Sequence, residues 1–251
     1  MNFISISRDA GIATITLNRG KVNALNEAMV EQLQAAFIAL QADAAVRAVI
    51  LTGQGKFFSF GFDIPEFLPY TPQEFTHYLT KFTDLYRSIF LFPKPVLAAL
   101  NGHTMAGGCM LATACDWRIM VTDRAKIALN EISLGATVLA GATEMLTFSV
   151  GARKAAQILY SGELYAAEAA QRLGLIDQLC DQPAELASLA QAHAQQMGSK
   201  DPQAFSSIKA LLRQPVLEHI QRREAQSIQE FVKIWYAPST QAKLAQVTIQ
   251  S

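Results

Sequence analysis

The chain has 251 residues, 51% of them hydrophobic, and its 21 basic side chains balance its 21 acidic ones. This length and apolar content predict a globular protein with a large core, built as one main domain with a smaller appendage. A net charge of zero provides no bulk field that would attract nucleic acid or an anionic membrane surface, so neither is an expected partner.

Cysteine spacing and the apolar runs exclude further classes. Cys109, Cys115 and Cys180 form no Cys-x-x-Cys pair and have no nearby histidine at ligand spacing, which argues against a disulfide framework and against a metal site. We expect them to be buried apolar residues. The N-terminus lacks a basic segment, and no apolar run reaches ~18 residues, so we expect no signal peptide, no membrane span and a cytoplasmic location.

The first half of the chain alternates between short apolar runs and amphipathic segments. Residues 3–6 and 12–17 predict a hairpin around a turn at residues 9–11, and residues 26–42 have apolar side chains at helical spacing. A strand at 46–52 follows. Residues 64–71 are interrupted by prolines and predict a loop with at most one helical turn. The next predicted elements are a helix at 73–90 and strands at 95–100, 116–122 and 126–129.

The second half is mainly helical. Its predicted helices span residues 138–150, 151–160, 166–174, 184–197, 202–213 and 216–236, with a strand at 175–180 and a short helix after Pro238. The apolar stripe that ends in Phe231 and Trp235 is too large to leave in water, so we expect it to pack on its own core or on a second subunit. Alternating strands and helices favour stacked ββα repeats or an open α/β sheet.

Residues 95–116 read as a strand, a turn and the start of a helix beside Gly107 and Gly108. The first N–H groups of a helix have no internal acceptor, and glycine lets a ligand approach the backbone. The pair therefore favours either an oxyanion site or tight packing of the helix against a strand. A second strand, at 49–53, leads into another glycine turn at 59–64, which ends in an acidic residue suited to opening a helix.

These two turns resemble the crotonase family, also called the enoyl-CoA hydratase/isomerase superfamily. The matching pieces are Asn23-Ala24-Leu25, the turn at 59–64, Lys94-Pro95, Asn101-Gly102, Ala106-Gly107-Gly108-Cys109, Cys115-Asp116, Asn130-Glu131 and Leu134-Gly135. The resemblance implies an α/β fold in which residues 1–182 form a spiral of stacked ββα repeats. It implies that residues 183–251 form a C-terminal helical trimerisation region, giving a homotrimer or a dimer of trimers.

The family acts on acyl-CoA thioesters and binds the thioester oxygen with two backbone N–H groups. By position these are the amides of Phe62 and Gly107. Removing a proton next to a thioester places negative charge on its oxygen, and one such donor lowers the barrier by about 2.7 to 4 kcal/mol. CoA belongs to the substrate, so the resemblance implies no separate cofactor and no metal.

Of the two acid/base carboxylates found in the family's hydratases, this chain keeps one. Glu131 matches one position, whereas Met110 occupies the other and cannot transfer a proton. A single glutamate suffices to move a double bond from the 3,4 to the 2,3 position of an enoyl-CoA, because it can take a proton from C2 and return it at C4. The resemblance therefore favours an enoyl-CoA isomerase. Hydratase activity, another enolate reaction such as decarboxylation, and a non-catalytic acyl-CoA-binding protein remain alternatives.

The apolar neighbours of Glu131 predict a raised pKa for its carboxyl. The resemblance also implies a set of substrate-binding residues: Lys21, Ala24, Phe60, Asp63, Ile64, Gly108 and Met110. His103 reads either as a residue facing the site or as a structural imidazole bonded to loop backbone. Glu144 lies on the following helix, and its distance from the site is left open.

Overall fold

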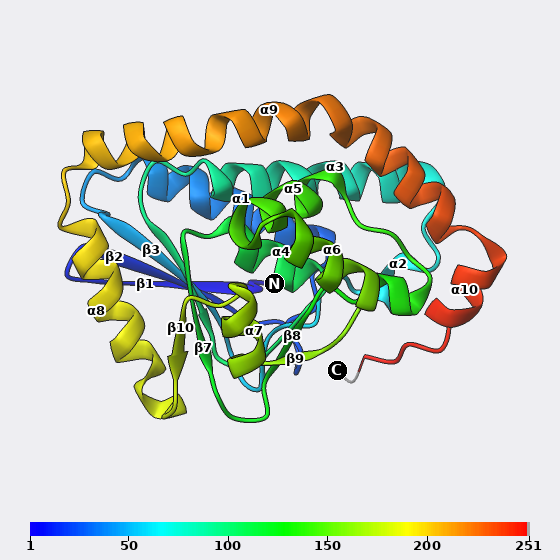
Figure 1. Cartoon of the computed structure of the whole chain (residues 1–251), viewed down its shortest axis with the longest axis horizontal. Helices are drawn as coiled ribbons and strands as arrows, with labels where there is room; N and C mark the ends of the chain where they lie inside the picture. The colour runs from blue at the N-terminus through cyan, green and yellow to red at the C-terminus, as the bar shows by residue number, and fades with distance from the viewer. Residues whose placement is uncertain (250–251) are drawn as a thin grey trace.

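The computed structural model describes residues 1–249 and contains two sheets (Figure 1). The larger sheet has six strands in the order β1-β2-β3-β5-β7-β10. Its strands are β1 (Ile4–Asp9), β2 (Ile12–Leu17), β3 (Ala48–Gly53), β5 (Val96–Leu100), β7 (Trp117–Val121) and β10 (Gln178–Cys180). Within this sheet β1 pairs antiparallel with β2, and the other pairings are parallel. Every residue of β5 is buried. Strands that are covered on both faces are expected to be continuous apolar runs, as this strand is.

The smaller sheet has four strands in the order β4-β6-β8-β9. They are β4 (Phe57–Ser59), β6 (His103–Met105), β8 (Lys126–Ala128) and β9 (Tyr165–Ala166). Strands β3, β5 and β7 of the first sheet are each followed directly by a strand of the second. The chain therefore stacks ββα units, which confirms the predicted fold class. Three of these short strands, β4, β6 and β9, were not predicted from the sequence.

Helices cover the sheets and separate the repeats. They are α1 (Glu27–Ala42), α2 (Ile64–Phe67), α3 (Pro72–Phe90), α4 (Gly107–Ala114), α5 (Ala140–Val150), α6 (Ala152–Ser161), α7 (Ala167–Leu173), α8 (Leu186–Gly198), α9 (Pro202–Trp235) and α10 (Pro238–Leu244), with short 3-10 turns at Glu131–Leu134 and Pro183–Glu185. Figure 1 shows α9 running along the molecule over α3 and α5, while α8 packs on strands of the larger sheet. The single turn of α2 is the one helical turn predicted between residues 64 and 71.

Helix α9 corrects the prediction of two separate helices at 202–213 and 216–236. It continues through Pro215, a residue that usually costs about 3 kcal/mol inside a helix because it removes one hydrogen bond. Pro215 lies on the exposed side, and Leu211, whose carbonyl loses its helical partner, is 75% exposed, so water can take that bond. Buried residues on both sides of the proline, Arg213 and Leu217, keep the axis continuous.

A buried ionic cluster fixes the first half of α9 to the core. Asp116 accepts a hydrogen bond from Lys209 Nζ at 2.7 Å and pairs with Arg213 at 3.0 Å. The guanidinium of Arg213 also donates to the carbonyl oxygen of Phe90 at 2.8 Å. Burial lowers the pKa of Lys209 to about 8, although Asp116 opposes that shift. The helix is therefore bonded to the end of α3 and to the start of β7.

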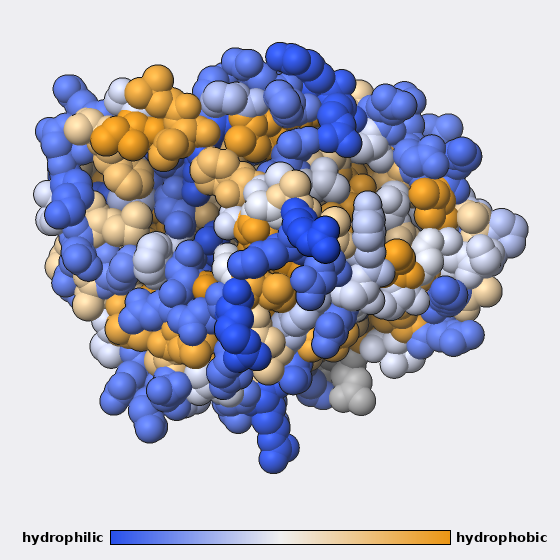
Figure 2. All heavy atoms as spheres, in the orientation of Figure 1, coloured by the Kyte–Doolittle hydropathy of each residue, from blue (hydrophilic) through white to orange (hydrophobic). Residues whose placement is uncertain are grey.

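The apolar stripe of α9 packs on the chain's own core, since Ile220, Ile228, Phe231 and Trp235 are buried. Figure 2 shows apolar surface over the first half of α9, the half that carries the exposed Ile208, Leu211 and Leu212. All three cysteines are buried and free, as expected. Within residues 1–249 no helix has the length and apolar character that crossing a bilayer requires.

Candidate active site

The two glycine turns meet at the start of α4. Gly61 has φ +95°, and a Cβ on it would lie 2.9 Å from the carbonyl oxygen of Met105 and 3.0 Å from the amide nitrogen of Gly107. Both the backbone angle and the space therefore require glycine at position 61. This contact brings Phe62, the residue after Gly61, beside the helix mouth, so the two predicted amide donors come from neighbouring stretches of backbone.

The amide of Gly107 follows a strained residue. Ala106 has φ +46° and ψ −118°, a conformation that costs a residue with a side chain of the order of 1–3 kcal/mol and that clusters at functional sites. Gly107 is the first residue of α4, so its N–H has no acceptor within the helix. Among residues 1–249, neither this N–H nor that of Phe62 has a hydrogen-bond acceptor. Two free backbone donors thus belong to residues that line one cavity.

Gly108 serves packing instead. A Cβ at this position would lie 2.7 Å from Cβ of Ser59 and 2.8 Å from its carbonyl oxygen, which leaves no room for a side chain. The two interpretations of the glycine pair therefore apply to different residues. Gly107 lines the cavity, whereas Gly108 lets α4 pack against the end of β4.

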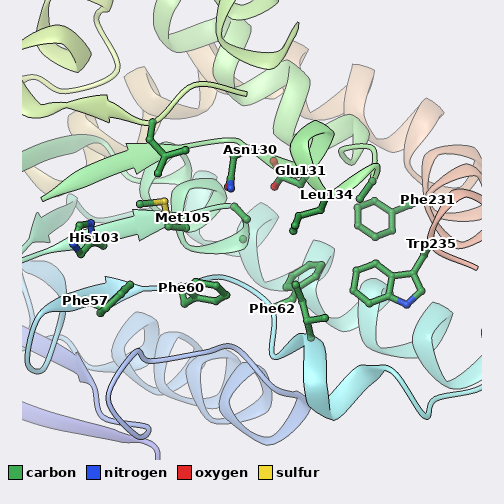
Figure 3. Close-up of a pocket in the computed structure, with 15 residues that line it drawn as sticks. Phe57, Phe60, Phe62, His103, Met105, Asn130, Glu131, Leu134, Phe231 and Trp235 are labelled. Carbon is green, nitrogen blue, oxygen red and sulfur yellow. The ribbon is translucent and has the colours of Figure 1, made fainter. Parts of the chain in front are cut away.

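The cavity is about 250 Å³ in volume and largely apolar. Its lining residues are Phe57, Phe60, Phe62, Ile64, His103, Met105, Ala106, Gly107, Asn130, Glu131, Leu134, Ala136, Leu164, Phe231 and Trp235. Figure 3 shows Phe57, Phe60 and His103 toward one end, Phe231 and Trp235 toward the other, and Glu131 between them. An elongated, mostly apolar ligand with its reacting atoms near the middle fits this arrangement.

Glu131 is the first residue of the 3-10 turn Glu131–Leu134 and is only 6% exposed. Neither of its carboxylate oxygens has a hydrogen-bond partner within the described chain. Burial therefore raises the pKa of Glu131 to about 8, which confirms the predicted upward shift. Among residues 1–249 it is the only carboxyl that lines the cavity. Such a group can accept a proton and hold it away from water.

The ring of Phe62 forms part of the cavity wall. It packs edge-on against Phe82 at 4.9 Å, Tyr78 at 5.1 Å and Phe231 at 6.3 Å between ring centroids. A Cβ on Gly107 would lie 3.0 Å from the same ring. The side chain thus fixes the backbone whose amide is the predicted donor, and it joins α3 to α9.

Asp63, predicted to bind substrate, has a structural part in this turn. Its Oδ2 pairs with Arg19 at 2.5 Å, and its Oδ1 accepts the N–H of Glu66 as the N-cap of α2. Arg19 also donates to the carbonyl oxygen of Ala24 at 3.1 Å. Asp63 does not line the cavity that Glu131 lines. Instead, the pair with Arg19 ties the glycine turn to the loop that holds Lys21 and Ala24.

A second hollow of about 740 Å³ adjoins the cavity, since Phe57 and Phe60 line both. Lys21 and Lys56 contribute two positive charges to this hollow. Ala24 lines a smaller surface pocket with Lys21 and Asp63. The structure therefore places Lys21 and Ala24 together, in hollows beside the cavity. Phe60 and Ile64, also predicted to bind substrate, line the cavity itself. A phosphate-bearing ligand would find its positive partners here.

Met110 was predicted to bind substrate, but it does not line the cavity. It is 1% exposed and absent from the cavity lining, because it is in the interior of α4. Gly108 is equally enclosed. Glu144 lies on α5 and pairs with Arg223 of α9, outside the cavity.

His103 both bonds to backbone and lines the cavity, the two alternatives that the sequence left open. Its Nδ1 accepts the backbone N–H of Lys126 at 3.2 Å, and its ring packs on Phe57 at 5.0 Å. It also lines the cavity, and burial lowers its pKa, which favours the neutral ring. Met105, Ala136, Leu164 and the α9 pair Phe231 and Trp235 line the cavity without having been predicted as site residues, and Asn130 and Leu134 were predicted only as parts of the matching motifs. The apolar stripe of α9 was visible in the sequence, but its target was not.

A buried carboxyl, two free backbone amides and an apolar cavity on stacked ββα repeats define a class of enzymes that polarise a carbonyl and move protons beside it. The family model described as enoyl-CoA hydratase/isomerase matches residues 7–245, and the chain belongs to this family. It is 36% identical over 213 residues to a probable enoyl-CoA hydratase of Bacillus subtilis, covering 84% of this chain and 82% of that protein.

Two further relatives are named for different activities, one as a hydratase and one as an isomerase. A 2,3-dehydroadipyl-CoA hydratase of Escherichia coli is 32% identical over 233 residues, covering 92% of this chain and 89% of its own. The crystal structure of the human mitochondrial delta3-delta2-enoyl-CoA isomerase superposes with a TM-score of 0.88 at 28% identity, covering 97% of this chain and 96% of that one. Hydratases and an isomerase thus share this fold, and the site residues must distinguish them.

Proposed function

We propose that the protein is an enoyl-CoA isomerase that shifts a double bond from the 3,4 to the 2,3 position of an acyl-CoA. The observation that carries this proposal is that Glu131 is the single carboxyl lining the cavity within residues 1–249. The second carboxylate position of hydratases is occupied here by the enclosed Met110. One acid that is able to give and take a proton meets the needs of a double-bond shift.

In the proposed reaction the thioester oxygen accepts hydrogen bonds from the amides of Phe62 and Gly107. The carboxylate of Glu131 takes a proton from C2, and the electrons of that C–H bond spread over the dienolate toward the thioester oxygen. The same carboxyl then delivers the proton to C4, so that the double bond ends between C2 and C3. The apolar wall keeps water from the dienolate, and no cofactor enters besides the CoA that the substrate carries.

The hollow beside the cavity suits the rest of the substrate. Lys21 and Lys56 would meet CoA phosphates, with Ala24 beside them, while Phe60 lies between the hollow and the cavity. The acyl tail would then run past Ile64 toward Phe231 and Trp235. We also propose that the exposed apolar face of α9 is covered in a homotrimer or dimer of trimers, which light scattering of the purified protein would test.

The direct test compares two substrates. The protein should convert a 3-enoyl-CoA to the conjugated 2-enoyl-CoA, and Glu131→Gln should abolish this conversion while leaving CoA affinity within about twofold. Exchange of the C2 hydrogen in heavy water would separate an enzyme from a binding protein. A wild-type protein that binds acyl-CoA without such exchange would refute the proposal.

Hydration of a 2-enoyl-CoA is the second candidate. It is favoured by the relatives, which include a probable enoyl-CoA hydratase and a 2,3-dehydroadipyl-CoA hydratase. Disappearance of the conjugated double bond from a 2-enoyl-CoA, measured alongside isomerisation of the 3-enoyl-CoA, gives the balance between the two reactions.

A further inference from the structure

The segment that follows α10 returns to the hollow beside the cavity. Figure 1 shows it leaving α10 and turning back toward the middle of the molecule. Thr248 and Ile249 line the hollow of about 740 Å³ together with Lys21 and Lys56, which belong to the first part of the chain. The two ends of the described chain therefore build this hollow together.

Ile249 lines two hollows at once. It contributes to the larger one with Lys56 and to the smaller one that Ala24 lines, and residues 20–22 line both as well. The isoleucine therefore lies beside the loop that carries Lys21 and forms a partition between the two hollows. Within residues 1–249 no carboxylate lines the larger hollow, so its charges favour an anionic ligand.

The segment forms a wall of the larger hollow and does not fill it. With Thr248 and Ile249 in place the hollow still measures about 740 Å³, which lies within the range of pockets that enclose a whole small-molecule ligand. Phe57 and Phe60 line both this hollow and the catalytic cavity, so one ligand can extend through both.

The segment has a fixed start and a loosely bonded end. Leu244, the last residue of α10, is completely buried. Val247 donates its N–H to the carbonyl oxygen of Leu244 at 3.0 Å and packs on the core. Beyond it, neither Thr248 nor Ile249 shares a backbone hydrogen bond with another described residue. A segment held mainly by side-chain contacts opens locally at a low cost in free energy.

We propose that Thr248 and Ile249 form a strap that opens to admit the phosphate-bearing part of CoA and closes over it once the phosphates meet Lys21 and Lys56. This inference rests on the proposed function in one respect, that the ligand is a CoA thioester whose phosphates enter the hollow. The closed strap reduces the access of water to the lysine–phosphate contacts, which strengthens them. Because it takes no part in proton transfer, it contributes to affinity and not to the chemical step.

The first test removes the strap. A chain that ends at Val247 keeps the residue that packs on the core, so it should unfold in urea as the wild type does. Its Kd for CoA, measured by calorimetry, should rise at least about fivefold, because an isoleucine side chain no longer covers the ligand. Equal or tighter binding of CoA by this truncated protein would overturn the proposal.

An acyl thioester of N-acetylcysteamine is the matched control ligand, because it has the acyl group and the thioester but no phosphates. Truncation should raise KM for the acyl-CoA several-fold, while kcat and the KM for the N-acetylcysteamine thioester stay within about twofold of the wild-type values. A KM that rises equally for both substrates would show that truncation disturbs the cavity itself, and the strap would have no role in holding phosphates.

Charge at position 249 tests whether this side chain faces an anion. Ile249→Asp should weaken CoA binding at least about fivefold relative to Ile249→Lys, and the difference should shrink at high salt. Ile38→Asp is the control for a change in net charge, because Ile38 is 60% exposed on α1 and lines neither hollow. It should leave the Kd within about twofold of the wild type. Equal Kd values in the two Ile249 variants would contradict the contact.

Closure can be followed by chemical labelling. The three native cysteines are buried, so a maleimide reports on the introduced thiol of Thr248→Cys. Saturating CoA should slow this labelling at least about fivefold, because the closed strap exposes the thiol less often. Ser199→Cys, at the exposed end of α8, should be labelled at the same rate with and without CoA. A labelling rate at position 248 that CoA does not change would overturn closure.

The failures of the two proposals are distinguishable, because binding of CoA is measured without any reaction. Wild-type protein that isomerises a 3-enoyl-CoA, with a truncated chain that binds CoA equally well, overturns the strap and leaves the isomerase intact. Wild-type protein whose CoA affinity depends on the strap but which shows no isomerisation overturns the proposed function and leaves the strap intact. Wild-type protein that does not bind CoA overturns both.

Discussion

The pH dependence of catalysis should follow the titration of Glu131. The carboxyl must be ionised to take a proton from C2, and burial raises its pKa to about 8. Such a group is ionised in about one molecule in eleven at pH 7 and in about ten in eleven at pH 9. We therefore expect kcat/KM for a 3-enoyl-CoA to rise roughly tenfold between these two pH values and to level off above pH 9.

The same shift has a consequence for folding. The folded-state pKa of Glu131 lies above the ordinary value of 4.5, so the folded protein binds this proton more tightly than the unfolded chain does. The stability that this tighter proton binding contributes to the folded protein is fully present below about pH 4.5, and it is lost as the pH rises toward 8. At pH 7 the unpaired, buried carboxyl lowers the free energy of unfolding by about 3 kcal/mol relative to an unshifted group.

Glu131→Gln separates the two effects. The amide does not titrate, so the variant should lose activity at every pH while resisting urea better than wild type, with a difference that grows from pH 5 to pH 8. The assays are a stopped-flow or steady-state pH profile of kcat/KM and urea unfolding at matched pH. A wild-type profile already flat between pH 6 and 9, or identical unfolding curves for the two proteins across that range, would refute the assignment of a buried, unpaired base.

Three further outcomes are expected. Trp235→Leu enlarges the far end of the cavity, so kcat/KM should shift toward longer acyl chains in a homologous substrate series, and an unchanged preference would count against the proposed path of the tail. Lys21→Ala should raise KM for acyl-CoA several-fold with little change in kcat, an effect that shrinks at high salt; a fall in kcat alone would argue against a phosphate contact. Asp116→Ala leaves Lys209 and Arg213 buried without their counter-charge and should cost about 3–5 kcal/mol in urea unfolding, whereas a loss below about 1 kcal/mol would show that the cluster is dispensable.

The sequence predicted those parts of the fold whose signals are local. The central strands are unbroken apolar runs, and α1 and α3 repeat their apolar residues at helical spacing with capping residues at their starts. Three strands of the smaller sheet, β4, β6 and β9, have no such signal, because their pairing depends on contacts between distant segments. Pro215 misled the prediction of α9 because the tertiary contacts that hold the helix together are invisible in the local sequence.

Some features of the candidate site were predicted from motifs, and others appear only in the structure. Gly107 and Glu131 were found because their motifs resemble a family, and the structure adds what no motif contains, the burial that leaves the carboxyl without a partner. Asn130 was part of the matching motif, yet nothing in the sequence showed that its side chain would fail to cap its own turn. Met110 shows the opposite case, since this position, predicted to bind substrate, is enclosed in α4 and does not line the described cavity.

The C-terminal helices belong to the site as well as to the surface. Phe231 of α9 packs on the ring of Phe62, the residue whose amide is a proposed donor, and Trp235 forms the far wall. Thr240 of α10 donates a hydrogen bond to the carbonyl oxygen of Gly135 at 2.9 Å, directly after the turn that carries Glu131. Because that turn is only four residues long, it has few bonds of its own to hold the carboxyl in place. The positions of both the donor and the base therefore depend on the part of the chain that follows the ββα repeats, whatever further part those helices take in assembly.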